Sequence, residues 1–332
     1  MRRTPRVRTT AVALTLALTA TACGAGDAGG GGGGDDPGGG AGEVVELAVA
    51  PASFDVAVGP DRRLVLALFT ADRERVAGGE VVVRLGHLGD EPGGEAELGP
   101  PVSASWLPVP GLDVPAPADG PAVVESGVLT GVYAARVALD APGYWGVLVE
   151  ARLTDGRTAR GRAIVPVLPE PAVVDVGDPA PSVANVTSAD VAAGTEPASA
   201  LDSRLRAEDA PDRAAPLHAT RIPDALASGR PLVVAIATPV YCQSLVCGPL
   251  TEHLVDLEAR YGDRAAFVHV EVWRDFEAQE LSPAAAAWIS TEAGGNEPWV
   301  FLVGADGRIA ARWDNVLDTA ELEALLEALP AA

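Results

Sequence analysis

The chain has 332 residues, of which 48% are hydrophobic, and a formal net charge of −22 at pH 7. A surface this acidic repels phosphate backbones and anionic lipid headgroups, so the composition argues against a nucleic-acid-binding protein. The length is sufficient for two domains, each with a core of its own.

The N-terminus has the layout of a secretory signal over residues 1–22. Basic residues precede the apolar stretch AVALTLALTA, which is too short to span a bilayer, and small residues lead into Cys23. A cysteine at this place resembles the lipobox of bacterial lipoproteins, with Ala20 where leucine is usual. The resemblance implies that Cys23 carries lipid and anchors an extracytoplasmic protein to the outer face of the cell membrane. A secreted protein with a spare thiol is the alternative.

Residues 23–43 are rich in glycine and predict a flexible tether, because they cannot bury apolar surface. Residues 44–168 contain short β-branched or alternating apolar runs, separated by turn signals such as Asp155-Gly156. This pattern predicts an all-β sandwich of immunoglobulin-like type with Trp145 in its core. We expect it to be a docking or spacer module.

Residues 169–215, dominated by Pro, Ala, Asp and Ser, predict a linker. Residues 216–332 alternate between strand and helix patterns. The elements predicted there, in chain order, are a strand at 231–238, a helix at 249–262, a strand at 265–273, a helix capped by Ser282, a hairpin over 298–314 and a helix at 318–329 opened by an Asp318/Glu321 capping box.

This order, with a cysteine pair after the first strand and Pro298 at the start of the hairpin, resembles the thioredoxin fold. VGDPAP, at 176–181, resembles the lead-in of thioredoxin-like and peroxiredoxin-like extracytoplasmic proteins. The whole arrangement resembles thioredoxin-domain lipoproteins. The expected fold class is therefore multidomain, an immunoglobulin-like sandwich followed by an α/β thioredoxin-like fold. In that family the proline matching Pro298 follows a cis bond and lies against the active-site disulfide.

Cys242 and Cys247 are the two cysteines that follow Cys23, and in an oxidising compartment they tend to form a disulfide. On one regular helix their Cα atoms would lie roughly 8.6 Å apart. A disulfide tolerates about 7 Å at most. Part of CQSLVC must therefore leave helical geometry in the oxidised state.

The resemblance implies that Cys242 is the exposed nucleophile and that Cys247 is the resolving thiol. It also implies a substrate groove formed by Tyr241, Glu297, Pro298 and Trp299. The chain departs from the family by having four residues between the cysteines and no acid on the strand that precedes them. Glu297 also stands before Pro298, where the family usually has a neutral residue. A carboxylate beside the cysteine pair would raise the thiolate pKa. A core position is the alternative for Trp299.

We therefore expect a membrane-anchored thiol–disulfide oxidoreductase that works outside the cytoplasm. Its expected partners are a protein thiol or disulfide and a membrane electron donor or acceptor, with no nucleic acid among them. No cofactor is expected, because the electrons travel through sulfur. Two non-catalytic alternatives stay open: a surface binding or scaffold lipoprotein, and a fixed staple, which for a ring this small is worth only about 2 kcal/mol.

Peroxide reduction is the catalytic alternative, because TPVYC nearly reproduces the motif of one atypical two-cysteine peroxiredoxin group. Thr238 stands one residue too far from Cys242 for that motif, and Arg308 or Arg312 would have to lower the thiol pKa.

A metal site is not expected. Copper delivery, as in Sco-type chaperones, would need a third ligand, and His253 and His269 are the histidines that follow the pair. His253 is expected on a polar helix face, and His269 in a packed strand. His87 and His218 are expected to be unconnected to any site.

Overall fold

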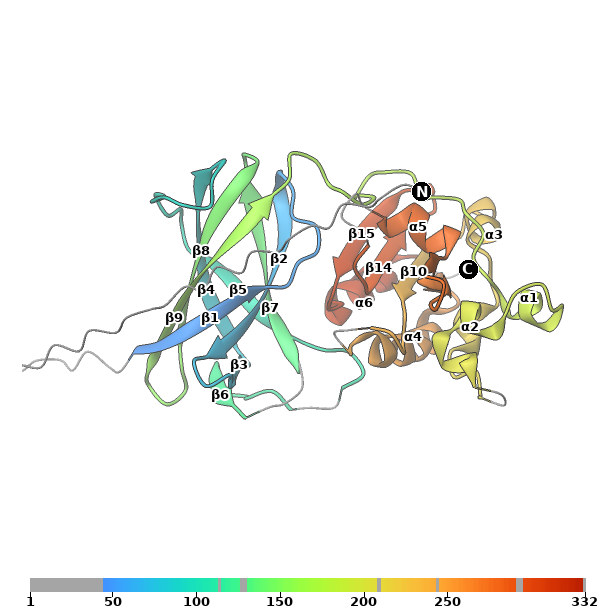
Figure 1. Ribbon diagram of the computed structural model, residues 1–332, viewed down its shortest axis with the longest axis horizontal. Helices are drawn as coiled ribbons and strands as arrows, with labels where there is room; N and C mark the ends of the chain where they lie inside the picture. The colour runs from blue at the N-terminus through green and yellow to red at the C-terminus, as the bar shows by residue number, and fades with distance from the viewer. Residues whose placement is uncertain are drawn as a thin grey trace, which may run out of the picture. The chain divides into compact units, whose positions relative to one another are not determined.

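The computed structural model describes residues 44–112, 115–125, 130–207, 210–242, 245–290 and 295–330. The signal segment 1–22, the tether 23–43 and the expected lipidation site Cys23 lie outside the described residues. Within the described part of the chain, no helix combines the length and the apolar character needed to cross a membrane. The regular elements between residues 44 and 167 are strands, and the described helices all come after them (Figure 1).

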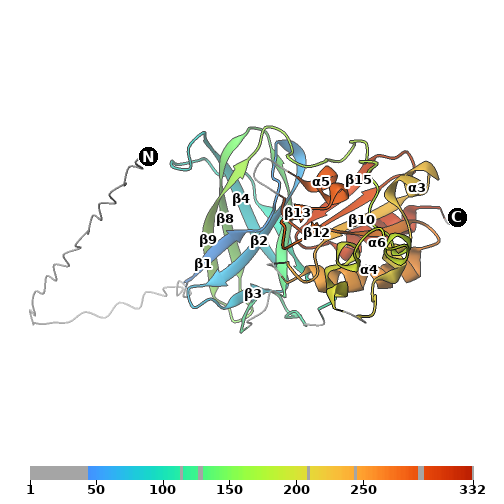
Figure 2. The ribbon, with the colours of Figure 1, turned by 45° about the vertical axis from the view of Figure 1, so that its right-hand side comes forward.

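The first sheet has nine strands, seven of which close into a barrel. The strands are β1 Val44–Pro51, β2 Gly59–Thr70, β3 Arg75–Ala77, β4 Glu80–Gly89, β5 Val102–Pro108, β6 Ala122–Val124, β7 Gly131–Leu139, β8 Gly143–Arg152 and β9 Thr158–Val167. The ladder runs β1-β9-β8-β4-β5-β7-β2, and β1 closes it by pairing with β2 as well. β1 is parallel to β9 and antiparallel to β2. Figure 2 shows the strands wrapping around the shared interior.

The predicted immunoglobulin-like sandwich is therefore wrong. A sandwich consists of two separate sheets with free edges, whereas here hydrogen bonding continues around the whole circuit through β1. Both architectures place alternate side chains inside and outside, so the apolar alternation in the sequence is the same for either. Closure depends on which strands pair, and the alternation does not encode that pairing.

The barrel interior is filled by apolar side chains that alternate along the strands. Leu64, Leu66 and Leu68 of β2 belong to this cluster, together with Tyr133, whose side chain is fully buried. The hydroxyl of Tyr133 donates to the carbonyl oxygen of Gly78 at 2.8 Å. Trp145, predicted to lie in the core, is only 8% exposed, and its Nε1 donates to the Ala141 carbonyl. That residue-level prediction is confirmed in a barrel instead of a sandwich.

A second sheet of four strands lies in the C-terminal half, in the order β11-β10-β14-β15. Its strands are β10 Leu232–Ala237, β11 Ala266–Glu271, β14 Trp299–Val303 and β15 Ile309–Asp314, and β12 Trp273–Asp275 pairs separately with β13 Glu280–Leu281. The helices are α1 Ser188–Ala192, α2 Ala198–Leu201, η1 Ser203–Arg206, η2 Ala215–His218, α3 Ile222–Ala227, α4 Cys247–Tyr261, α5 Pro283–Ile289 and α6 Thr319–Ala328.

β10 is buried on both faces, as its continuous apolar run predicts. Its even-numbered residues, such as Val234, pack in one cluster with α3 and α5. Its odd-numbered residues, such as Val233, pack in another cluster with α4 and α6. This strand therefore fixes the position of whatever follows it in the chain, which is the segment that carries Cys242.

The predicted fold class is also wrong for the C-terminal half. In an α/β fold the sheet is mostly parallel, but only β10 and β11 run parallel here, and the β10–β14 and β14–β15 pairs are antiparallel. Taken together, the described residues form a mostly β molecule with a closed barrel and few helices, in which no α/β thioredoxin-like domain is evident. The resemblance depended on the order of elements along the chain, and that order does not determine their pairing.

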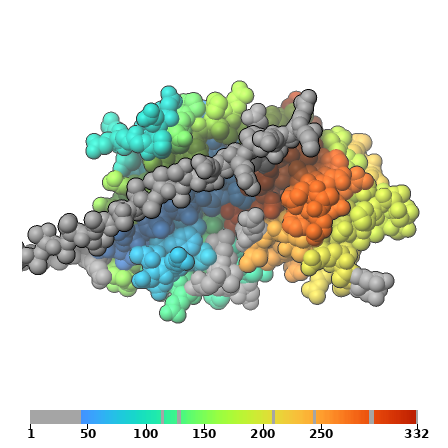
Figure 3. All heavy atoms as spheres, in the orientation of Figure 1, coloured from blue at the N-terminus to red at the C-terminus, as the bar shows by residue number. Residues whose placement is uncertain are grey.

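The stretch predicted as a linker, 169–215, contains α1, α2 and η1 and buries several of its side chains. Val173 joins the cluster around α3 and α5, and Leu201, Asp202 and Ser203 are each at most 3% exposed. In Figure 3 this stretch, coloured yellow-green, lies on the surface beside the orange residues of the C-terminal half. It contributes polar groups to the interior near the cysteine pair.

Candidate functional site

Cys242 and Cys247 form a disulfide with their Cα atoms 6.1 Å apart. Cys247 is the first residue of α4, and Cys242 lies in a turn after β10, where its N–H donates to the Thr238 carbonyl at 3.1 Å. Leu245, between them, has a φ of 62°. The prediction that CQSLVC departs from helical geometry is confirmed, because the helix starts only at its last residue.

The disulfide is buried in an apolar cluster. Cys242 is 5% exposed and Cys247 is fully buried. The same cluster contains Val65 and Ala67, which lie on the outer face of β2, and Val132 of β7. The expected exposure of the nucleophile Cys242 is therefore wrong for the disulfide form, because the outer wall of the barrel packs against the pair.

The loop after β5 also reaches the start of α4. Val109 belongs to the cysteine cluster. Gly111 has a φ of +77°, and a Cβ at this position would collide with the carbonyl oxygen of Pro249 in the first turn of α4. Only glycine provides both this backbone conformation and this close approach. The loop therefore covers the end of the helix that carries Cys247.

Cys247 occupies the N-terminus of the 15-residue helix α4. The first N–H groups of a helix have no partners within it and carry partial positive charge. A thiolate formed at this position is stabilised by them, which lowers the thiol pKa and makes the sulfur a better leaving group. The helix end therefore favours opening of the disulfide at Cys247.

The residues predicted to form the groove have different surroundings. Tyr241 stacks on Phe276 with ring centroids 3.7 Å apart and planes 4° apart. Trp299 is 2% exposed, lies against Phe54 and Phe301, and has the guanidinium of Arg312 over its ring. Trp299 therefore occupies a core position, which was the alternative to its predicted place in the substrate groove.

The Glu297–Pro298 peptide bond is cis, and the Pro298 carbonyl accepts the N–H of Asn315 at 2.9 Å. Glu297 is partly buried, and this burial raises the pKa of its carboxyl group. The neutral form of Glu297 is therefore favoured more than in water.

Glu271, a buried carboxyl at the end of β11, is not among the site residues predicted from the sequence. Its side chain accepts the N–H of Ser203 at 2.7 Å and that of Val272 at 3.0 Å. The Ser203 hydroxyl in turn accepts the N–H of Val240, two residues before Cys242. Burial raises the pKa of Glu271 to about 7, although the donors oppose it. A glutamate in the apolar strand AAFVHVEVW was the signal available.

His218, expected to be unconnected to any site, and His269, expected in a packed strand, form a buried hydrogen-bonded pair. Nε2 of His218 lies 2.9 Å from Nδ1 of His269. Burial lowers the pKa of His269 to about 4, with a further contribution from His218. Of the other histidines, His253 contacts the hydroxyl of Thr319 and His87 contacts the Pro142 carbonyl.

Comparison with known proteins does not assign the chain to a family. No protein-family model matches it, and no curated protein matches it.

Proposed function

We propose that Cys242 and Cys247 are a redox-active pair that exchanges electrons with the thiols and disulfides of other proteins outside the cytoplasm. The observation that supports this most is the position of the disulfide, which joins the first residue of a 15-residue helix to a turn five residues earlier. A purely structural disulfide stabilises a fold most when it closes a long loop, whereas the ring closed by Cys242 and Cys247 is short. The helix end instead stabilises the thiolate that exchange requires.

The proposed exchange begins at Cys242, because its sulfur belongs to the more exposed of the two residues. A partner thiolate attacks the Cys242 sulfur and forms a mixed disulfide, while Cys247 leaves as the thiolate at the helix N-terminus. A second thiol of the partner, losing its proton, then displaces Cys242. The partner gains a disulfide, and this protein gains two thiols and two electrons. In the reverse direction the Cys242 thiolate attacks a partner disulfide, and Cys247 then displaces the partner, which leaves with two thiols while the Cys242–Cys247 bond re-forms.

Peroxide reduction receives less support from the surroundings of the pair. The two arginines considered for it interact with other groups. Arg312 pairs with Asp55 at 2.9 Å and Asp175 at 3.0 Å. Arg308 donates to the Gly177 carbonyl at 2.7 Å. Neither guanidinium is therefore assigned to a thiolate.

The test is capture of the mixed disulfide. In a Cys247→Ser variant the Cys242 thiolate can still attack a partner disulfide, but the thiol that would then displace the partner is missing. Cys242 should therefore retain a partner protein through a bond that dithiothreitol releases. Cys242→Ser is the matched control and should capture much less, because Cys247 is fully buried. If both variants capture nothing from cells, and the wild-type disulfide resists a reduced glutathione buffer, the pair is a staple.

We further propose that Cys23 carries the lipid that tethers the protein, with a membrane electron donor or acceptor as its second partner. The signal-like segment and the cysteine after it support this. A Cys23→Ser variant should move from the membrane fraction to the soluble extracytoplasmic fraction. Retention of that variant in membranes would contradict lipid anchoring at Cys23.

A further inference from the structure

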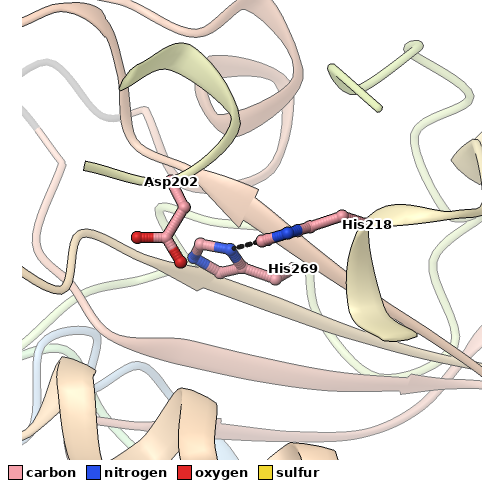
Figure 4. A group of neighbouring side chains, drawn as sticks. All are labelled: Asp202, His218 and His269. Atoms are coloured by element: carbon pink, nitrogen blue, oxygen red, sulfur yellow. Dashed lines mark hydrogen bonds between the residues drawn. The ribbon is translucent and has the colours of Figure 1, made fainter. Parts of the chain in front are cut away.

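The buried pair of histidines lies on two different elements, His218 at the end of η2 and His269 in β11 (Figure 4). Their inner nitrogens, His218 Nε2 and His269 Nδ1, are 2.9 Å apart. Both residues are at most 1% exposed. Two imidazoles therefore face one another in the interior with no room for bulk water between them.

The outer nitrogen of each ring has an acceptor of its own. His218 Nδ1 lies 2.8 Å from Oδ2 of Asp212, and His269 Nε2 lies 3.1 Å from the carbonyl oxygen of Ala237. An ionised carboxylate and a carbonyl can only accept, so each outer nitrogen carries the hydrogen. In neutral rings both inner nitrogens then present lone pairs to each other. Such an arrangement favours a cation between them, either a proton or a metal ion.

A third donor group lies beside the pair. The carboxylate of Asp202 is 1% exposed, and one of its oxygens and one nitrogen of each histidine lie within 4.8 Å of one another. Figure 4 shows the carboxylate directed toward the ring of His269. Arg204 also donates to Asp202, with Nη2 2.7 Å from Oδ2.

We propose that His218, His269 and Asp202 bind a divalent metal ion of the zinc class. Two imidazoles and one carboxylate form a ligand set that zinc accepts, whereas calcium and magnesium prefer oxygen ligands alone. Histidines that bind metals nearly always donate their outer N–H to a carboxylate or a backbone carbonyl. Asp212 and Ala237 supply one acceptor of each kind.

The histidines need to move little to hold the ion. Zinc–nitrogen bonds of 2.0–2.1 Å at a tetrahedral angle separate the two nitrogens by about 3.3 Å, so the rings part by about 0.4 Å. The ligands come from η2, β11 and the residue that precedes η1, so the ion would tie the 169–215 stretch to the second sheet. Its role is structural and independent of the cysteine chemistry.

The first test uses the full-length protein with its disulfide intact, so that Cys242 and Cys247 cannot bind metal as thiols. After chelation and dialysis, added Zn²⁺ should bind at one equivalent per chain and raise the midpoint of thermal unfolding. Zinc-edge X-ray absorption should show two imidazoles at about 2.0–2.1 Å. Absence of binding by this protein would overturn the proposal and leave a proton as the shared cation.

The second test assigns the ion to these residues. Asp212→Asn keeps the Oδ1 acceptor for the Ala214 N–H but replaces the Oδ2 acceptor of His218, and should weaken Zn²⁺ binding about 10- to 100-fold. His269→Asn should abolish binding, and His87→Asn, at an exposed site, should leave it unchanged. If Asp212→Asn and His269→Asn both bind Zn²⁺ as the wild type does, the ion lies elsewhere and the proposal fails.

Discussion

Glu271 is subject to two opposing influences, its burial and the N–H groups that donate to it. Burial is the larger, and it raises the pKa of the carboxyl group from 4.5 to about 7. The folded protein therefore holds this proton more tightly than the unfolded chain does. The resulting stabilisation is fully present below pH 4.5 and is lost as the pH rises through 7.

The corresponding prediction concerns Glu271→Gln, whose side chain cannot ionise. Between pH 4.5 and pH 8 the wild type should lose about 3 kcal/mol of unfolding free energy that the variant keeps. Urea unfolding at a series of pH values measures the difference between the two proteins. Glu277→Gln, at an exposed position, is the control and should follow the wild type. Parallel curves for wild type and Glu271→Gln would show that Glu271 ionises normally.

At the scale of residues, the sequence predicts contacts between residues that are close in the chain. It does not predict contacts between residues that folding brings together from distant positions. Cys242 and Cys247 lie five positions apart, so their disulfide could be anticipated. Glu271 meets Ser203 across 68 residues, and His218 meets His269 across 51. The contact of Ser203 follows from the packing of the 169–215 stretch, whose composition gives no periodic signal, and the contact of His218 follows from the packing of η2 just after it.

At the scale of elements, α6 shows how far a capping motif can be predicted. Asp318 accepts the N–H of Glu321 at 3.0 Å, which is half of the predicted capping box. The Glu321 side chain does not complete it. That carboxylate accepts Nε1 of Trp313 at 2.7 Å and pairs with Arg136 of the barrel. A distant partner thus redirects a side chain whose backbone role was predictable.

Asp318→Ala should therefore lower the free energy of unfolding by about 1 kcal/mol, the usual worth of a helix N-cap. Asp318→Asn retains an acceptor oxygen and should cost only a fraction of that. Chemical unfolding of the two variants beside the wild type measures both values. Equal losses for alanine and asparagine would mean that the charge of Asp318 matters and that the cap does not.

In the strand β2, residues on both faces are buried, which a simple alternation of apolar and polar residues would not predict. Leu64, Leu66 and Leu68 point into the barrel, yet Val65 and Ala67 on the outer face are buried as well. A barrel strand whose outer face is exposed to solvent would have polar residues at those positions. The continuous apolar run LVLALF thus indicates that something covers the outside of β2, and in the structure that cover is the cysteine cluster.

At the scale of the whole molecule, the barrel and the second sheet are joined by buried charge as well as by apolar contact. Arg63, on the same outer face of β2 as Val65, pairs with Asp314 at 2.6 Å, and both side chains are 8% exposed. Asp314 also accepts the N–H of Phe54. Removing one partner of such a pair leaves an uncompensated charge. The disulfide therefore lies under a cover that is held in place independently of the cysteines.

The outer face of β2 and the loop that carries Gly111 together cover the disulfide. We therefore expect the reactivity of the disulfide to depend on how often these two parts move away from α4. Gly111→Ala places a Cβ against the Pro249 carbonyl and should weaken the cover by 1–2 kcal/mol. Dithiothreitol should then reduce the Cys242–Cys247 bond about 5- to 30-fold faster than in the wild type. The rate of appearance of free thiols measures this.

Gly156→Ala is the matched control for that experiment. Gly156 also has a positive φ, 88°, so alanine strains its backbone in the same way, but nothing lies within 4 Å of the added Cβ. This variant should lose stability while its disulfide reacts at the wild-type rate. If both alanine variants accelerate reduction equally, the effect is general loosening. If neither does, the pair is reached without any movement of the barrel, because the 5% exposure of Cys242 already suffices for attack.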